Sequence, residues 1–390
     1  MCERGSVGAG AGAGAGAGRR AAAARRRAAA ATGLAVALGA LLLLLVLLSY
    51  AAEWPLLGAL RAARSSVPDD VACYAPDDFP SAEAGALDDD AAALRPTESS
   101  IFFHETTCGA AGAAGAVRLT ARQACAVESA AVLHPHRTVY VLVMAGGGGA
   151  RSRNVSQWSA AARALLAYPN VRVARVAIAR FVRGTPLHAW FAAGALVGSR
   201  WPRSHASDVL RFLTLWRFGG TYLDLDVVVT RPLDGLRNFA GAESATDLGS
   251  SVLGFARDAL GRRVAAECLR ELRDDFDGND WSHNGPGVIT RVLQRLCDAS
   301  QVSDMTPERC AGFRVLPPSA FFPVPWPQWR RYFQEQGAAL TMAAINGSYV
   351  IHVWNRMSAA AIVSLHSEQP YAQVARQFCP RVAQSAGAYF

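Results

Sequence analysis

The stretch SDVLRFLTLWRFGGTYLDLDVVV, residues 207–229, decides the fold, because it joins a helical pattern to a strand pattern across two glycines. Apolar residues recur at helical spacing over residues 204–218. Gly219 and Gly220 then end the helix, since glycine adopts the backbone conformations that close one. Residues 222–229 follow as an apolar strand with acidic residues at alternate positions. The stretch predicts a helix, a tight turn and a buried strand in succession.

The same alternation of patterns continues before this stretch. Short apolar runs at 101–103 and 138–144 flank a helical stretch at 124–133. A second helical stretch, at 158–167, leads through a Pro-Asn turn to an alternating strand at 171–178. Strands that alternate with helices predict an α/β domain with a mostly parallel sheet.

Asp224 and Asp226 are the first candidates for chemistry. In open α/β sheets ligands bind beyond the carboxyl ends of the strands, where this pair is expected. Two aspartates two residues apart on a strand point to one face, so both carboxylates can bind one divalent cation. The alternative is a pair of solvated carboxylates at a sheet edge. The apolar surroundings favour the cation, because ionised carboxylates are costly there unless they are compensated.

The preceding helix offers a second charged pair. Asp208 and Arg211 are three residues apart, so they share a helix face and can form an ion pair or hold the polar groups of a sugar. Ser207 is the expected N-cap of this helix. Gly219 and Gly220 either allow a ligand to approach the backbone closely or simply end the helix.

The N-terminal part predicts a membrane protein. Residues 1–31 are rich in Gly, Ala and Arg and are expected to form a disordered cytoplasmic tail. Residues 32–52, uncharged over 34–48, are expected to form a single transmembrane signal-anchor; a cleaved signal peptide and a buried core helix are the alternatives. A lumenal stem at 53–99 and a catalytic domain at 100–390 would follow.

Charge does not indicate a nucleic-acid partner. The formal net charge is +8, but six arginines and one glutamate place +5 of it in the tail. About +3 remains for the rest of the chain, too little for a nucleic-acid-binding surface.

Cysteines and sequons fit a secreted compartment. The cysteines beyond the anchor are odd in number, so one is unpaired or pairs between chains, and a homo-oligomer stays open. None has the C-x-x-C spacing of a zinc site, so disulfides are favoured, with Cys108 and Cys125 as the first expected pair. Asn154 and Asn346 begin N-x-S sequons and are candidate glycosylation sites.

The central motifs resemble a known family. Ser-Asp-x-x-Arg at 207–211, followed by Gly-Gly-x-Tyr-x-Asp-x-Asp at 219–226, resembles the signature of family 32 glycosyltransferases with a sugar-binding Asp-x-Asp region. More narrowly, IFFHETTC, CAVESA, HNGPG and HVWN resemble segments of the α-1,4-glycosyltransferases; they begin at residues 101, 125, 283 and 352. The resemblance runs in order over about residues 100–380.

This resemblance implies a GT-A fold, a UDP-sugar donor, usually Mn²⁺, and a retained α linkage in the product. It implies a type II Golgi membrane enzyme of glycosphingolipid biosynthesis. Such an enzyme would move galactose from UDP-galactose in α-1,4 linkage onto a terminal galactose-type residue of a glycolipid such as lactosylceramide.

The family also implies roles for single residues. Asp226 would bind the metal, and Asp224 would contact the ribose and the metal or its water. His352 would complete the metal shell, although a structural imidazole is its alternative. Asp208 and Arg211 would hold the donor sugar. The catalytic candidates are Asp224, Asp226 and Asp208, and the remaining donor-binding candidates are Gly219, Gly220, Tyr222, Asn284 and Gly285.

Several alternatives stay open at this stage. The donor sugar can be N-acetylgalactosamine or N-acetylglucosamine, with a glycolipid or O-glycan acceptor, and a mannosyltransferase is a further candidate. An inactive lumenal partner or chaperone, or a metal-dependent lectin, is the alternative from outside the enzymes. The sequence shows no convincing nucleophile, so same-face attack is the preferred route to retention.

Overall fold

The computed structural model describes residues 72–75, 94–108, 116–144 and 155–390, which all belong to one compact unit, 67–390. The predicted tail at 1–31, the anchor at 32–52, most of the stem at 53–99 and the sequon at Asn154 lie outside these residues. Within the described part of the chain, no helix combines the length and the apolar character needed to cross a membrane.

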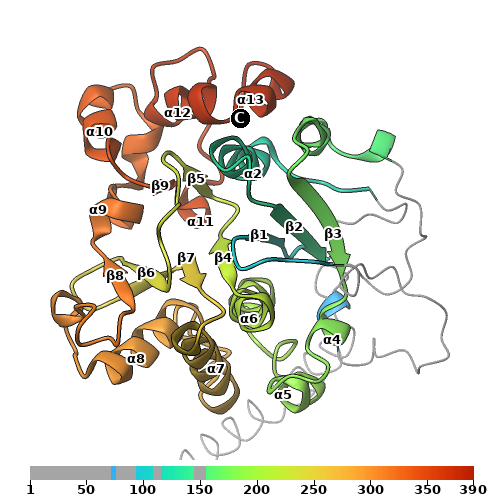
Figure 1. Cartoon of the computed structure of the whole chain (residues 1–390). Coiled ribbons are helices and arrows are strands. Elements are labelled where there is room, and N and C mark those ends of the chain that lie inside the picture. Colours follow the sequence, from blue (N-terminus) through green and yellow to red (C-terminus); the bar gives the residue numbers. More distant parts are fainter. Residues whose placement is uncertain (1–71, 76–93, 109–115, 145–154) are drawn as a thin grey trace, which may run out of the picture. The chain divides into compact units, whose positions relative to one another are not determined.

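A seven-stranded sheet forms the centre of the unit (Figure 1), in the order β3-β2-β1-β4-β7-β6-β8. Its strands are β1 (Ile101–Glu105), β2 (Val139–Met144), β3 (Val171–Val176), β4 (Gly220–Leu223), β6 (Phe239–Ala242), β7 (Leu248–Phe255) and β8 (Arg314–Leu316). β7 is antiparallel to both of its neighbours, and the other pairings are parallel. The predicted α/β class with a mostly parallel sheet is confirmed.

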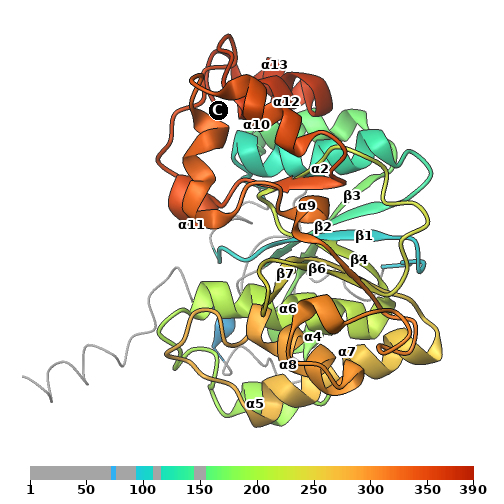
Figure 2. The same cartoon turned by 90° about the vertical axis from the view of Figure 1, so that its left-hand side faces the viewer.

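Side chains alternate between two cores on the two faces of this sheet. Along β1, Ile101 and Phe103 belong to one core and Phe102 to the other, as the two-residue period of a strand requires. Figure 2 shows helices above and below the sheet. The first core includes residues of α2 (Ala121–Leu133), α3 (Ala160–Ala164), α9 (Pro318–Phe321), α10 (Ala338–Ile345), α12 (Pro370–Phe378) and α13 (Pro380–Ala386). The second includes residues of α4 (Ile178–Phe181), α5 (His188–Ala192), α6 (Pro202–Phe218), α7 (Ala259–Asp274) and α8 (Pro286–Cys297).

The remaining elements are short. They are α11 (Asn355–Ser358) and the 3-10 segments η1 (Ala72–Tyr74), η4 (Val155–Gln157), η5 (Leu165–Ala167), η6 (Val302–Asp304) and η7 (Trp326–Phe333). Two of the predicted helices have other bounds in the structure than in the prediction. The helical stretch at 158–167 divides into α3 and η5, and α2 begins at Ala121, where Thr120 and Gln123 form a capping box.

A second, two-stranded sheet pairs β5 (Val227–Val229) with β9 (Val350–His352) in antiparallel register. The prediction of one strand over 222–229 is therefore wrong, because β4 ends at Leu223 and the chain turns before β5. The Val227 N–H donates to the Asp224 carbonyl at 3.0 Å across this turn. Alternating aspartates fit a strand and this turn equally well, so the pattern alone did not reveal it. The register places Val227 opposite His352.

Ser207 is not the N-cap of α6, so this prediction from the central stretch is wrong. α6 begins at Pro202, and proline is favoured in the first turn of a helix because its missing N–H is not needed there. Ser207 lies inside the helix instead, where its hydroxyl accepts a hydrogen bond from Arg211 at 3.0 Å.

The cysteines pair differently from the prediction of Cys108 with Cys125, which is wrong. The disulfides are Cys73–Cys108, Cys125–Cys379 and Cys297–Cys310. Cys125 lies on α2 and faces the junction of α12 and α13, whereas Cys108 lies beyond the end of β1, next to η1. Cys268 is a buried free thiol, which accounts for the odd count. The first disulfide attaches part of the expected stem to the domain.

Candidate active site

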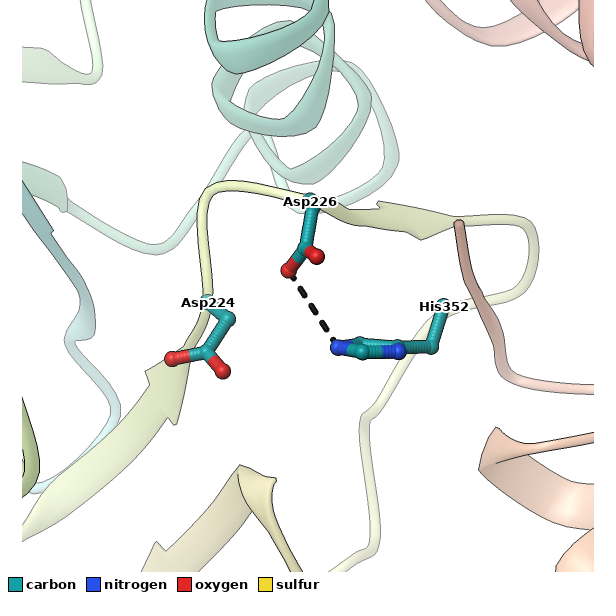
Figure 3. Close-up of side chains that lie close together, drawn as sticks. All are labelled: Asp224, Asp226 and His352. Atoms are coloured by element: carbon teal, nitrogen blue, oxygen red, sulfur yellow. Dashed lines mark ion pairs between the residues drawn. The ribbon is translucent and has the colours of Figure 1, made fainter. Parts of the chain in front are cut away.

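Three side chains from two neighbouring segments converge at one point. Asp224 directly follows β4, Asp226 lies in the turn before β5, and His352 is the last residue of β9. One ligand atom from each lies within 4.8 Å of the other two, and Figure 3 shows the three side chains around a common space. The structure thus brings together the three residues that the sequence predicted as metal ligands.

Asp226 and His352 form a coupled pair. Asp226 Oδ1 lies 3.3 Å from His352 Nε2, and Asp226 Oδ2 accepts the Asn355 N–H at 2.8 Å. Burial alone would raise the pKa of Asp226, but His352 and the Asn355 N–H outweigh it and lower this pKa. Burial alone would lower the pKa of His352, and Asp226 outweighs it and raises this pKa.

Arg211 connects the helix to the aspartates. Its Nη1 lies 3.3 Å from Asp224 Oδ1, and its Nη2 lies 3.1 Å from Asp208 Oδ1. Nη1 also donates to the carbonyl and the hydroxyl of Ser250, at 2.8 and 2.9 Å. Burial opposes the charge of Arg211, but Asp224, Tyr222 and Asp208 raise its pKa, so the guanidinium stays charged. The ion pair predicted between Asp208 and Arg211 is confirmed.

Asp208 itself is buried, with 5% of its surface exposed. Burial raises the pKa of Asp208 to about 7, with Arg211 opposing the rise and Asp224 adding to it. The carboxyl can therefore hold or release a proton near neutral pH.

Tyr222 holds Asp224 through a hydrogen bond. Its hydroxyl donates to Asp224 Oδ1 at 2.5 Å, and the Arg211 guanidinium lies 4.9 Å from the centroid of its ring. Tyr222 is fully buried, and its contacts show that it positions the aspartate. Its role as a donor-binding residue stays a prediction.

Asn284 and Gly285 lie behind Asp208. The Asn284 side chain is fully buried; its amide donates to the Asp277 carbonyl at 2.6 Å and its oxygen accepts the Asp277 N–H at 3.0 Å. A Cβ on Gly285 would lie 2.2 Å from Asp208 Oδ1. Asn284 thus fixes a loop, and the missing side chain of Gly285 leaves room for the Asp208 carboxylate.

Gly219 and Gly220 lie at the other end of β4 from Asp224. Both have positive φ, and a Cβ on Gly220 would lie 2.6 Å from the Ser100 carbonyl. These contacts give them a conformational requirement, and their donor-binding role stays a prediction. A pocket of about 310 Å³ is lined by Gly220 and Asp234 but by neither Asp224 nor Asp226.

The donor set fits a divalent cation. Two carboxylates and one imidazole are ligands that Mn²⁺ and similar ions accept. The Nδ1 atom of His352 is buried and has no hydrogen-bond partner among the described residues. The two aspartates lie side by side, and a bound cation would add to the compensation that Arg211, Tyr222, His352 and the Asn355 N–H give their charges. The three residues therefore fit the metal that the family implies.

Sequence reasoning missed two features of this site. Ser250, on the antiparallel strand β7, holds Arg211 through its carbonyl and hydroxyl, and no sequence signal marks it. The close contact between Gly285 and Asp208 is the second, although the glycine lies within the HNGPG segment.

Asn346, the described sequon, is exposed in a turn after α10, where a glycan has room.

Two family descriptions match the chain. "Glycosyltransferase sugar-binding region containing DXD motif" matches residues 120–244, and "Alpha 1,4-glycosyltransferase conserved region" matches residues 258–386. The first includes both aspartates of the site, and the second includes Gly285 and His352.

Named relatives agree with both matches. Lactosylceramide 4-alpha-galactosyltransferase of Homo sapiens is 31% identical over 299 residues, which cover 75% of this chain and 79% of the relative. Alpha-1,4-N-acetylglucosaminyltransferase of Homo sapiens is 27% identical over 259 residues, which cover 66% of this chain and 74% of the relative. Among solved structures, the galactosyltransferase LgtC covers 73% of this chain at 16% identity, with a TM-score of 0.35. This chain belongs to the α-1,4-glycosyltransferase family.

Proposed function

We propose that this chain transfers galactose from UDP-galactose, in α-1,4 linkage, onto a terminal galactose-type residue of a glycolipid such as lactosylceramide. The convergence of Asp224, Asp226 and His352 within 4.8 Å supports the proposal, because these residues would form the metal site that such a donor needs. The choice of galactose and of a glycolipid is supported by the name of the 31% identical human relative.

Asp224, Asp226 and His352 would hold a divalent cation, Mn²⁺ in the first instance. When bound, the cation supplies positive charge that neutralises the leaving diphosphate. The chain itself keeps the ligands in place: Arg211 and Tyr222 hold Asp224, and the Asn355 N–H holds Asp226. Preorganisation of this kind means that little reorganisation is needed during the reaction.

Asp208 stays the candidate that contacts the donor sugar. Its carboxyl is held by Arg211, and its raised pKa, about 7, makes the neutral acid available as a hydrogen-bond donor to a hydroxyl. Gly285 leaves the space in which this carboxyl sits. In this proposal Arg211 holds Asp208 and Asp224 in one orientation.

Retention of the α configuration would follow from attack of the acceptor hydroxyl on the same face as the leaving diphosphate. In that step the acceptor oxygen bonds to the anomeric carbon, the bond to the diphosphate breaks, and the diphosphate accepts the hydroxyl proton. A covalent glycosyl-enzyme, trapped with a slow donor and located by mass spectrometry, would instead show a nucleophile.

We further propose a type II topology, with the anchor at 32–52, the tail in the cytoplasm and the catalytic domain in the Golgi lumen. Three disulfides and the exposed sequon at Asn346 suit that compartment. Electrophoresis of the expressed chain before and after glycosidase treatment tests the lumenal placement. We expect the treatment to shift the wild-type band and to leave the double variant Asn154→Gln, Asn346→Gln unchanged.

An α-1,4-N-acetylglucosaminyltransferase is the second candidate, because a human enzyme of that name is 27% identical. The deciding experiment measures nucleotide release from UDP-galactose, UDP-N-acetylgalactosamine, UDP-N-acetylglucosamine and GDP-mannose, with lactosylceramide and other acceptors, with and without Mn²⁺. We expect Mn²⁺-dependent turnover of UDP-galactose, absent in Asp226→Ala, and an α-1,4 linkage by NMR. Turnover of another donor would reassign the sugar, and a folded chain inactive with every donor would favour a noncatalytic partner.

A further inference from the structure

An arginine lies between two tryptophans close to the site. The Arg356 guanidinium carbon lies 4.3 Å from the centroid of the Trp281 ring and 4.9 Å from that of Trp201. Trp281 is 38% exposed, and Arg356 is exposed as well. Among the described residues, Arg356 has no hydrogen-bond or ion-pair partner. We name these three residues the tryptophan-arginine cluster.

Each member of the cluster comes from a segment that also builds the active site. Trp201 directly precedes α6, which carries Asp208 and Arg211. Trp281 lies four residues before Gly285, in the loop that packs against Asp208.

Arg356 ties the cluster most closely to the metal ligands. It follows Asn355, whose N–H is 2.8 Å from Asp226 Oδ2. The contact of Asn355, the reach of one residue and one arginine side chain, and the contact with the ring together place Trp281 within roughly 18 Å of Asp226. The cluster thus lies at the edge of the site.

The chemistry of the cluster suits a saccharide. An indole offers a flat apolar face to the C–H groups of a sugar ring, and a guanidinium offers N–H donors to its hydroxyls. The stacked guanidinium needs no carboxylate to stay in place, because the two rings attract its charge. Among the described residues none of its N–H groups has a hydrogen-bond partner, so they are open to a ligand.

From this arrangement we propose that the tryptophan-arginine cluster is an acceptor subsite, which binds the sugar next to the galactose that receives the transferred residue. The proposal rests on the proposed function and extends it to the acceptor. The donor diphosphate is the alternative ligand for Arg356. It is disfavoured because the aromatic faces would add nothing to its binding, and because the metal ligands already provide its place.

Two variants test the subsite in the full-length chain, in detergent micelles. Trp281→Ala removes the apolar face, and Arg356→Gln removes the charge and most of the donors. Trp326→Ala is the matched control, since Trp326 is 53% exposed and lies on η7, outside the cluster. Steady-state kinetics would vary lactosylceramide and UDP-galactose separately, and saturation-transfer NMR would follow binding of free lactose in the presence of UDP and Mn²⁺.

We expect each cluster variant to raise the KM for lactosylceramide about tenfold, with the KM for UDP-galactose and the kcat close to those of the wild type, as removal of uniform binding predicts. The lactose signal should weaken in both variants and persist in Trp326→Ala. A raised KM for UDP-galactose with an unchanged acceptor KM would assign Arg356 to the diphosphate and overturn the subsite.

Failure of the proposed function would look different. A wild-type chain that transfers no sugar refutes the galactosyltransferase, and the lactose signal then decides the subsite by itself: its absence overturns the subsite too. Normal transfer with unchanged acceptor KM in both variants overturns the subsite alone.

Discussion

Arg211 is the residue on which the geometry of the site depends most. Its guanidinium contacts Asp208, Asp224 and Ser250 at once, and only 5% of its surface is exposed. A planar fork with five donors can span these partners, whereas a lysine ammonium is a point charge that can serve one side.

Arg211→Lys is therefore expected to reduce kcat/KM by about 100-fold or more, through misplacement of both carboxylates. Transfer kinetics would measure this loss, and circular dichroism would check the fold. Arg270→Lys, an exposed pair with Glu267 on α7, is the control and should behave as the wild type. Wild-type kinetics in Arg211→Lys would show that charge alone is enough.

Asp226→Asn tests the metal site without the reaction. The amide keeps the shape of the side chain but loses its charge, so we expect Mn²⁺ affinity to fall by about tenfold or more. Calorimetric titration of Mn²⁺ into the chain, with no donor present, measures this directly. Equal Mn²⁺ affinity in both proteins would mean that Asp226 is not a ligand.

At this scale the sequence predicted more than at any other. Spacing alone indicated the pairing of Asp208 with Arg211, and the aspartates stood out because they interrupt an apolar run. His352 required the family resemblance, since an imidazole between Ile351 and Val353 has no signal of its own. Ser250 could not be found, because it meets Arg211 only when β7 pairs with β4.

Two elements meet at Gly285, where the loop before α8 packs against α6. A Cβ there would lie 2.2 Å from Asp208 Oδ1, so Gly285→Ala must displace either the loop or the carboxylate. We expect a loss of activity of about 100-fold, because small displacements of positioned groups have effects of that size. Gly287→Ala is the matched control, since its Cβ would lie 2.7 Å from the end of the Arg291 side chain and 3.3 Å from the Ser282 carbonyl, and not against Asp208.

Transfer kinetics with a melting curve for each variant separates the two effects at Gly285. Similar activity losses in both alanine variants would contradict the specific role of the Gly285 contact. A Gly285→Ala protein that does not fold would be replaced by Asp208→Asn, which removes the same carboxylate without adding bulk.

The Cys125–Cys379 disulfide joins α2 to the junction of α12 and α13, across 254 residues of sequence. Long closed loops restrict the unfolded chain most, so its removal by paired Cys→Ser changes should lower the free energy of unfolding by about 5 kcal/mol. The same change at Cys297–Cys310, separated by 13 residues, should cost about 3 kcal/mol or less. Denaturant unfolding measures both; the reverse order would contradict the loop-length argument.

Helices and strands were predicted correctly where the hydrophobic period of one element continued without a break. They were predicted wrongly where the period was interrupted or imitated. α2, α6, β1 and β2 were recognised because their patterns extend over most of each element, although the predicted bounds differ from the observed ones by up to three residues. The strand expected at 222–229 failed because residues 224–226 form a turn that keeps strand-like alternation. The start of α6 was missed because Ser207 looked like a cap, although Pro202 begins the helix.

For the whole molecule, the class of fold followed from the sequence but the arrangement did not. Alternating patterns gave the parallel sheet, since strands separated by helices pair side by side. The return of β9 to β5, across more than a hundred residues, has no local signal. That return brings His352 to Asp226, so the metal site depends on the least predictable part of the topology.

The stability of the whole domain should depend on pH through two buried histidines. His134 donates from Nδ1 to the Ala130 carbonyl and accepts the Leu233 N–H at Nε2, at 2.9 and 2.7 Å, which only the neutral ring can do. Burial lowers the pKa of His134 to about 4 and, with Arg211, that of His104 to about 3. Both pKa values lie below that of an unfolded histidine, near 6.5.

Below about pH 6.5 the unfolded chain therefore binds protons that the folded chain refuses, and the free energy of unfolding must fall as the pH drops towards 4. Each histidine contributes a slope of up to about 1.4 kcal/mol per pH unit. Urea unfolding of wild type and His134→Gln at pH 7, 6, 5 and 4 measures the slopes. We expect the variant to be less stable at pH 7 and to lose less stability on acidification, because one titrating group is gone. Parallel curves for the two proteins would show that His134 takes up its proton without unfolding, and that its neutral form is not what the fold requires.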